Sequence, residues 1–457
     1  MSTKNMDTPT TQSFAFRPLC ILYEDSERTE ELIEALLSLG FPKRLLKRWV
    51  VIGGFLDIDL ATPPKKEWLY FSRLSASASM RKHEGSIAFG RHILEWLDFH
   101  GCDVINGIHA FELEVSKVRQ YMALQRAGIP YPSTRMISCE SAIPSAVSSW
   151  IEKRGATDQV FYIKPVTGGS GMAVKRYTSY KKFESDVKGG GGPFRKGQKA
   201  PDALYLLQES KEEQIDWFHR TKKKLMGKKK LFYRAEFINQ KFLYVLRIAT
   251  PVTVNSTCPC DAPTRFDNEF DIVPDPDVHF GDAEGFKSFI QRCIGFMKTN
   301  AMFVGAFEFS RPGGPGTPFY IYDINPNTNY NEKAEKKLDK GQRGLIRTAK
   351  MLMSYAHLAI KEVETLEPDE SVSKSNHPEK SSGPSSPPSF ADPKELEPPL
   401  EEPLTSSDSP LSHPQPQHPQ TKHQVSSSHS SHQVPSTPLE AREKKSLLEA
   451  FRSSLRA

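Results

Sequence analysis

Long apolar runs are absent from this chain of 457 residues. None approaches the roughly 18 apolar residues of a membrane-spanning helix, so we expect no membrane span. The opening MSTKNMDTPTTQSF has no apolar core, which argues against a secretory signal. Cysteine is also scarce, with six in the whole chain. Only Cys258 and Cys260 lie close together, without the second pair that a typical zinc site needs.

Aromatic residues are nearly missing from the C-terminal part. Between Pro368 and Pro438 only Phe390 is aromatic, whereas this segment holds 15 of the 35 prolines. Four lysines against nine acidic residues give it a net charge of −5, which leaves +11 for the rest of the chain. So little apolar surface cannot offset chain entropy, and we predict a disordered tail over 367–438.

Two shorter segments flank the folded part and the tail. We expect residues 1–17 to form a disordered arm. Residues 439–457 contain LEAREKKSLLEAFRSSL, which places Leu447, Leu448 and Phe451 on one face and predicts a short amphipathic helix. A docking helix, a membrane-surface helix and a transient helix all fit this pattern. The tail is a candidate for binding other proteins.

The remaining sequence predicts two domains. Over 18–135, short apolar runs such as 19–23 alternate with segments of helical spacing such as 85–100, which indicates a parallel α/β domain. Over 136–366, hairpins dominate. Strands expected at 232–238 and 242–248 are joined by only two residues, so we expect an α+β unit with antiparallel sheets.

A glycine-rich turn follows an apolar strand in FYIKPVTGGSGMAV, residues 161–174. Lys164 ends the strand, and the turn contains Gly168, Gly169, Ser170 and Gly171. Backbone N–H groups of such a turn can surround phosphate oxygens, while the lysine points a cation at them. It is not a Walker A loop, because the GK[ST] sequence is missing. Taken alone, a turn of this kind is more often only a turn.

Three oxygen-bearing residues lie on two later strands. Glu308 occurs in VGAFEF, and Asp323 and Asn325 occur in YIYDIN. Because Asp323 and Asn325 are two residues apart, they share one face of a strand. Carboxylates and an amide suit Mg²⁺, which takes a few such ligands together with nucleotide phosphates. Ordinary charges at a strand edge are the alternative, although an uncompensated carboxylate among apolar residues is costly.

In the order of these motifs the chain resembles the ATP-grasp superfamily, and within it the RimK-like and glutathione-synthetase-like carboxylate–amine ligases. The resemblance covers about residues 19–362 and implies an ATP-grasp fold. Matching positions imply that Lys117 and Lys164 hold the nucleotide, and that Gly168, Gly169, Ser170 and Gly171 form a loop that covers its phosphates. Gln208 and Glu209 match the hinge that contacts the adenine or ribose, and Arg247 matches the catalytic arginine, with Arg234 as the second choice. Glu308, Asp323 and Asn325 match the metal ligands. One departure is Asp323, since the family usually has glutamate there.

The resemblance also implies a reaction. Such ligases use ATP and Mg²⁺, with Mn²⁺ as an alternative, to join a carboxylate to an amine through an acyl phosphate. The substrates would be small carboxylates and amines, including amino acids or peptides. A different interpretation remains open, in which the chain is an inactive nucleotide-binding scaffold whose tail recruits partners.

Two further features carry charge. Arg73 and Arg81 follow the strand near residue 70, where they could clamp a substrate carboxylate or only pair with a neighbouring acid. Lysines 222–224 and 228–230 could form a nuclear-import signal or a binding patch, but we favour a solvated loop. Because no aromatic residues are interleaved with these lysines, we do not expect nucleic-acid binding.

Scattered cysteines suit a reducing compartment, so we expect a cytoplasmic protein, with nuclear entry through the lysine cluster left open.

Deletion of residues 368–457 should leave the melting temperature of the folded part unchanged within error, because this segment lacks the apolar side chains of a core. Calorimetry of the truncated and full chains tests this expectation. A loss of several degrees would show instead that the C-terminal helix docks on the folded part.

Overall fold

The computed structural model describes residues 16–24, 26–51, 56–81, 83, 85–169, 173–188, 200, 202–218, 225–251 and 269–357. The expected tail over 367–438 and the expected helix over 439–457 lie outside the described residues, as do Ser170 and Gly171.

Of the N-terminal arm expected over residues 1–17, only residues 16 and 17 belong to the described part of the chain. There Phe16 forms a β-bridge with His357, and the backbone N–H of Arg17 donates to the carbonyl of Ala356 at 2.8 Å. The folded part therefore begins slightly before residue 18, and its first and last described residues are hydrogen-bonded to each other.

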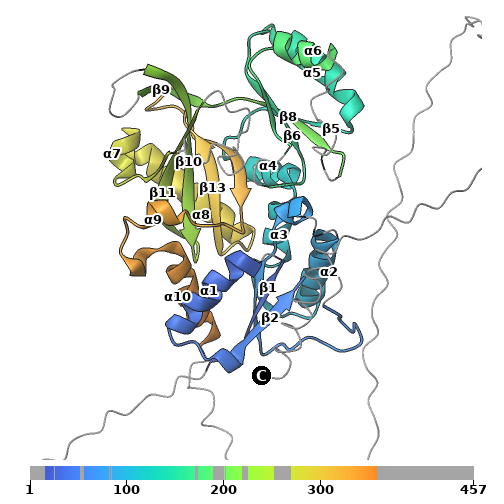
Figure 1. Cartoon of the computed structure of the whole chain (residues 1–457), viewed down its shortest axis with the longest axis vertical. Coiled ribbons are helices and arrows are strands. Elements are labelled where there is room, and N and C mark those ends of the chain that lie inside the picture. Colours follow the sequence, from blue (N-terminus) through green and yellow to red (C-terminus); the bar gives the residue numbers. More distant parts are fainter. Residues whose placement is uncertain are drawn as a thin grey trace, which may run out of the picture. The chain divides into compact units, whose positions relative to one another are not determined.

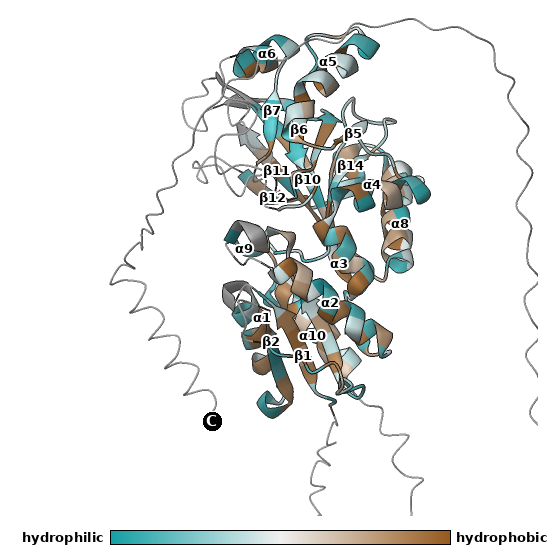
Figure 2. Ribbon diagram, turned by 90° about the vertical axis from the view of Figure 1, so that its right-hand side faces the viewer, coloured by the Kyte–Doolittle hydropathy of each residue, from teal (hydrophilic) through white to brown (hydrophobic). Residues whose placement is uncertain are grey.

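A four-stranded parallel sheet forms the N-terminal part, in the order β2-β1-β3-β4. Its strands are β1 (Leu19–Tyr23), β2 (Leu46–Val50), β3 (Leu69–Arg73) and β4 (Asp103–Ile105). Leu19 and Ile21 pack with side chains of α1 (Ser26–Ser38), whereas Cys20 and Leu22 pack with those of α2 (Ser86–Phe99). Because helices cover both faces, β1 is buried and apolar along its length, as its brown colour in Figure 2 shows. The expected parallel α/β domain is confirmed.

A second, antiparallel sheet has the order β5-β8-β6-β7. It contains β5 (Thr134–Ile137), β6 (Phe161–Pro165), β7 (Lys175–Tyr177) and β8 (Tyr205–Glu209), with α5 (Ile143–Arg154) and α6 (Tyr180–Lys188) beside it. Phe161 and Ile163 pack toward these helices. The alternate residues of β6, Tyr162 and Lys164, therefore point away from the helices.

The third sheet is antiparallel and has the order β12-β11-β10-β13-β14, with β9 paired to β10. Its strands are β9 (Glu213–Phe218), β10 (Leu225–Ile238), β11 (Lys241–Pro251), β12 (Glu269–Ile272), β13 (Val304–Ser310) and β14 (Tyr320–Asn325). Helix α8 (Ala283–Thr299) packs on one face of this sheet (Figure 1), where Phe289 and Phe296 join the core with Phe307. Asn239 and Gln240 connect β10 to β11 with φ of 54° and 56°, as a two-residue hairpin turn requires.

The remaining helices are α3 (Ile108–Val115), α4 (Lys117–Arg126), α7 (Pro276–Phe280), α9 (Glu332–Glu335) and α10 (Gly344–Ala356). Ser116 separates α3 from α4, and its side-chain hydroxyl caps α4 by accepting from the Arg119 N–H at 3.4 Å. Helix α10 packs against α1, so the last described helix completes the core of the N-terminal sheet (Figure 1).

The lysines at 228–230 do not form a solvated loop, because they lie on β10. Lys229 and Lys230 are buried, and Lys229 pairs with Glu269 at 3.0 Å. Burial lowers the pKa of Lys230 to about 8. The expectation of a loop is wrong for these residues, whereas lysines 222–224 lie outside the described part. Within that part, no helix combines the length and the apolar character needed to cross a membrane.

Gln120 joins α3 and α4 to β14. Its Nε2 donates to the carbonyls of Leu113 and Ile324, both at 2.8 Å, and its Oε1 accepts from the Ile324 N–H at 3.1 Å. Gln120→Ala should lower the free energy of unfolding by about 2–4 kcal/mol, because it leaves several buried backbone groups unpaired. Urea denaturation measures the change. Gln125→Ala, on the exposed side of the same helix, is the control and should stay within about 0.5 kcal/mol of the parent; equal effects would contradict the role of Gln120.

Candidate functional site

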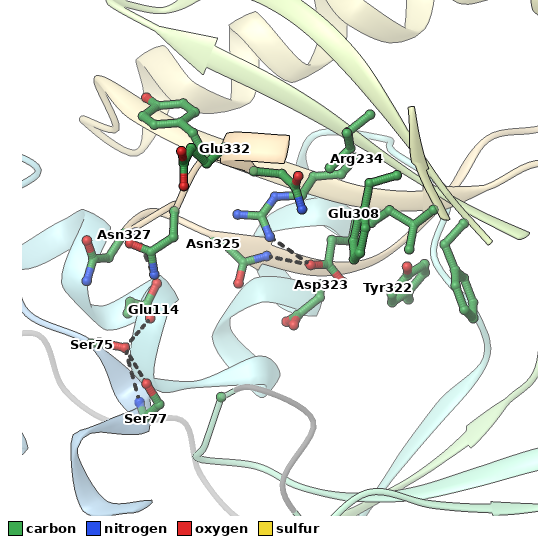
Figure 3. Close-up of a pocket in the computed structure, with 18 of the residues that line it drawn as sticks. Ser75, Ser77, Glu114, Arg234, Glu308, Tyr322, Asp323, Asn325, Asn327 and Glu332 are labelled. Atoms are coloured by element: carbon green, nitrogen blue, oxygen red, sulfur yellow. Dashed lines mark hydrogen bonds and ion pairs between the residues drawn. The ribbon is translucent and has the colours of Figure 1, made fainter. Parts of the chain in front are cut away.

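A pocket of about 1140 Å³ is lined by strands of the second and third sheets, and by residues of α1 and of the loop that follows β3. Ligand pockets commonly have volumes of about 300–1,000 Å³, so this one offers room for more than one small ligand. Figure 3 shows part of its lining. Glu308, Asp323 and Asn325 lie on neighbouring strands, and Ser75 and Ser77 lie in the loop that follows β3 of the N-terminal sheet.

The three expected metal ligands come together in this pocket. Glu308 and Asp323 are paired across β13 and β14, one residue before a register shift on β13. Asn325 lies two residues after Asp323, and its Nδ2 donates to Glu308 at 3.3 Å (Figure 3). The pairing of β13 with β14 therefore brings two carboxylates and an amide to one spot.

Burial raises the pKa of Glu308; Arg234 opposes this increase, and Asp323 adds to it. Among the described residues, no three His, Cys, Asp or Glu side chains form a metal-binding group by themselves. Two carboxylates with one amide still fit Mg²⁺, which is usually held by one or two carboxylates together with the phosphates of a nucleotide.

Both expected nucleotide lysines reach the same place. Lys117 Nζ pairs with Asp323 at 2.8 Å. Burial alone would lower the pKa of Lys117, but the contact with Asp323 outweighs it, so the pKa is raised. Lys164 Nζ donates to the hydroxyl of Tyr121 at 2.6 Å and to the carbonyl of Tyr322 at 3.2 Å. Burial, and then the charge of Lys117, lower the pKa of Lys164 to about 7.

The described part of the glycine turn also lines the pocket. Gly168 has a φ of 142°, which side chains rarely allow, and a Cβ on Gly169 would stand only 3.0 Å from the Cβ of Ser77. The turn thus closes against the loop after β3. Ser170 and Gly171 continue it outside the described residues.

The expected hinge residues, Gln208 and Glu209, line the pocket as well. Gln208 Nε2 donates to Tyr121 and to the hydroxyl of Thr134, both at 2.8 Å. Glu209 pairs with Lys211 at 2.5 Å and with Arg154 at 3.2 Å. Their side chains are thus held by the protein itself, which leaves the neighbouring backbone as the surface for a ligand.

The two expected catalytic arginines lie on opposite faces of the third sheet. Arg234 points into the pocket, where it pairs with Glu236 at 2.8 Å and with Glu308 at 3.3 Å (Figure 3). On β11, Leu246 and Ile248 line the pocket. Arg247 alternates with them and faces the α8 side, near Asp271 at 3.9 Å. The structure does not bring Arg247 to the other site residues.

The two expected substrate arginines are engaged by the protein. Arg73 is buried, and its Nη2 donates to Asn329 at 3.2 Å. Arg81 is ion-paired with the buried Glu24 and donates to Ser77 at 2.8 Å. Neither arginine lines the pocket, although Ser77 and Asn329 do.

Sequence reasoning missed two features of the site. Tyr121 links both lysine-bearing elements, because its hydroxyl accepts from Lys164 and Gln208 and donates to the Tyr322 carbonyl at 2.8 Å. The second feature is a row of asparagines that all line the pocket: Asn325, Asn327, Asn329 and Asn331. The alternation in NPNTNYN was a readable signal for it, because residues two apart in an extended segment share a face.

No protein-family model matches the chain, and no curated protein matches it. Solved structures do resemble it. D-cycloserine synthetase is 13% identical, with 74% of this chain and 99% of that chain covered and a TM-score of 0.47. A RimK-domain ATP-grasp protein from Sphaerobacter thermophilus is 14% identical, with 74% and 99% covered and a TM-score of 0.44. The VanG D-Ala:D-Ser ligase from Enterococcus faecalis is 10% identical, with the same coverage and a TM-score of 0.48. These likenesses concern the fold alone.

Lys164 should make stability depend on pH. The folded-state pKa of about 7 lies below the roughly 10.4 of an unfolded lysine, so between these values the unfolded state binds more protons and stability rises with pH. The cost of burying this lysine is therefore full below pH 7 and fades toward pH 10. Lys164→Met removes that cost, so its stability relative to the parent should fall as pH rises from 6.5 to 9.5, measured by urea denaturation. The exposed Lys298→Met is the control and should show a constant difference; a constant difference for both would contradict the buried cation.

Proposed function

We propose that this chain is an ATP- and Mg²⁺-dependent ligase that joins a carboxylate to an amine. One observation supports this most strongly: Lys117, Lys164, Arg234, Glu308, Asp323 and Asn325 meet in a single pocket although they come from five different elements. Cations and hard oxygen ligands side by side are what a nucleoside triphosphate with its metal ion requires.

The nucleotide is expected to lie between the second and third sheets. Lys164 and the turn at Gly168 and Gly169 would surround its phosphates, and the backbone beside Gln208 would contact its base. Glu308, Asp323 and Asn325 would hold Mg²⁺, which supplies neutralisation of the phosphate charge when it is bound. Lys117, now paired with Asp323, can turn its charge toward the phosphates of a bound nucleotide.

The reaction that fits this arrangement has two steps. An oxygen of the substrate carboxylate attacks the γ-phosphorus of ATP, the bond to the β-phosphate oxygen breaks, and ADP leaves. The amine nitrogen then attacks the carbonyl carbon of the acyl phosphate, loses a proton and expels inorganic phosphate, which leaves an amide. Negative charge builds up at the transferred phosphoryl group and at the carbonyl oxygen, and Arg234 is the pocket arginine placed to stabilise it.

The two arginines on neighbouring strands allow a matched test. ADP release should be measured with a panel of carboxylates and amines, together with ATP affinity on the same preparations. Arg234→Gln should lower turnover by orders of magnitude and change ATP affinity little, because its charge is needed mainly in the transition state. Arg247→Gln removes the same charge from the opposite face of the sheet and should keep turnover within about threefold. The reverse result would restore the assignment that the sequence favoured.

Two further variants guard against misfolding and test the metal ligands. Arg234→Lys keeps the charge beside the buried Glu236 and should fold even if Arg234→Gln does not. Asp323→Ala should abolish ATP turnover while the fold survives. If ATP binds tightly but no carboxylate–amine pair ever releases ADP, the chain is a nucleotide-binding scaffold and the ligase proposal is wrong.

A further inference from the structure

One carboxylate of the pocket has no part in the chemistry described above. Glu114 lies near the end of α3, shortly before Lys117, and its side chain lines the pocket. Its Oε1 accepts from the Ala76 N–H at 3.2 Å and from the Ser75 hydroxyl at 3.4 Å, and its Oε2 accepts from the Asn327 N–H at 3.2 Å. An ionised carboxylate can accept about four hydrogen bonds, so within the described part of the chain Oε2 keeps capacity for a ligand.

The surroundings of Glu114 favour its protonated form. Burial raises the pKa of this carboxyl; the N–H groups of Asn327 and Ala76 oppose the increase, and the charge of Asp323 adds to it. Lys117 lies near enough for its charge to act on Glu114, but its Nζ is paired with Asp323 at 2.8 Å. A raised pKa suits a group that takes up a proton near neutral pH.

Glu114 lies on the side of the pocket from which an amine can approach. In Figure 3 it lies beside Asn327 and Ser75, and Asn325 separates this group from Glu308. The nucleotide is expected between the second and third sheets, whereas α3 and the loop after β3 belong to the N-terminal part of the chain. The side opposite the nucleotide is therefore left to the attacking nitrogen.

Most other acids that line the pocket already balance a cation or are expected to hold one. Glu308 and Asp323 are the expected metal ligands. Ion pairs with basic residues engage the others of this group: Glu209, Glu212 and Glu332. A carboxylate that neutralises a fixed cation has less affinity for a proton, because the cation favours the ionised form.

The remaining acids are less well placed for the reaction. Burial raises the pKa of Glu335 as well, but the charge that opposes the increase is that of Arg343, which directly precedes α10. Glu31 and Glu34 are exposed on α1. Among the described residues that line the pocket, Glu114 thus combines a place beside the metal ligands with a carboxylate that no ion pair engages.

We infer that Glu114 is the catalytic base of the second step: it binds the amine substrate as an ammonium ion and takes a proton from it. One N–H bond of the ammonium breaks, and the proton passes to Oε2, which leaves a neutral amine with its lone pair. The nitrogen attacks the carbonyl carbon, the bond from that carbon to the phosphate oxygen breaks, and the departing phosphate takes a second proton. The inference rests on the proposed ligase function, which leaves the acceptor of the first proton open.

The test compares amines that differ in charge near neutral pH. Hydroxylamine is largely uncharged there, whereas methylamine, glycine and most amines of the panel are ammonium ions. ADP release is measured with the full chain, ATP, Mg²⁺ and a carboxylate that supports turnover. Glu114→Gln should lower kcat with the charged amines by about 100-fold or more, the usual contribution of a general base, and kcat with hydroxylamine by less than about threefold.

Two further variants guard against effects on the fold. Glu112→Gln is the matched control, because Glu112 lies on the same helix, pairs with Arg119 at 3.0 Å and does not line the pocket. It should stay within about twofold of the parent with every amine. Glu114→Asp keeps the carboxylate and should fold even if Glu114→Gln does not. Its shorter side chain should lower kcat with the charged amines by about tenfold or more and spare hydroxylamine.

The outcomes separate this inference from the proposed function. Equal losses with charged and uncharged amines would show that Glu114 only holds the loop after β3, and a loss confined to KM would show an anchor that takes no proton. Either result would overturn the inference and leave the ligase intact, as would a parent that uses hydroxylamine but none of the charged amines. If the parent releases no ADP with any amine, the ligase proposal is wrong and the inference falls with it.

Discussion

Two partly buried carboxylates, paired across neighbouring strands, are the constraint on which the rest of the site depends. Glu308 and Asp323 are paired across β13 and β14, and like charges away from water are costly unless cations lie beside them. Lys117 supplies one cation from α4, and Arg234 supplies the other from β10. The helix and the strands must therefore meet at one point, and this requirement fixes how the N-terminal half of the chain joins the third sheet.

Tyr121 extends this arrangement to the second sheet. Its hydroxyl accepts hydrogen bonds from Lys164 and Gln208 and donates one to the backbone of β14. One polar group therefore connects a helix to strands of two sheets. Buried polar networks stabilise a unique arrangement only when every member is satisfied. Here β6 and β8 turn their polar residues toward the pocket while their apolar residues pack on α5 and α6. The same alternation that builds each core thereby furnishes the site.

The pocket is built at a cost to stability. Burial beside Lys117 brings the pKa of Lys164 down to about 7, so the protein holds a cation where a neutral side chain would be more favourable. This cost falls if an anion binds beside Lys164, and functional sites commonly keep groups that destabilise the fold for such a reason.

The sequence by itself determined the parallel sheet, most of the strands of the two antiparallel sheets, and the position of Asp323 and Asn325 on one face of a strand, whereas the pairing of β13 with β14 put Glu308 beside them. These follow from local rules: apolar runs form strands, and residues two apart share a face. Only the tertiary structure decided which arginine enters the pocket. Both faces of β11 are apolar around Arg247, because Val245 and Ala249 pack on α8 while Leu246 and Ile248 line the pocket, so its pattern does not reveal which face holds the site. The prediction of a solvated loop was wrong at Lys229 and Lys230 for a related reason. A run of lysines resembles a solvated loop until strand pairing with β9 and β11 buries it, and pairing between distant segments is not written in the local sequence.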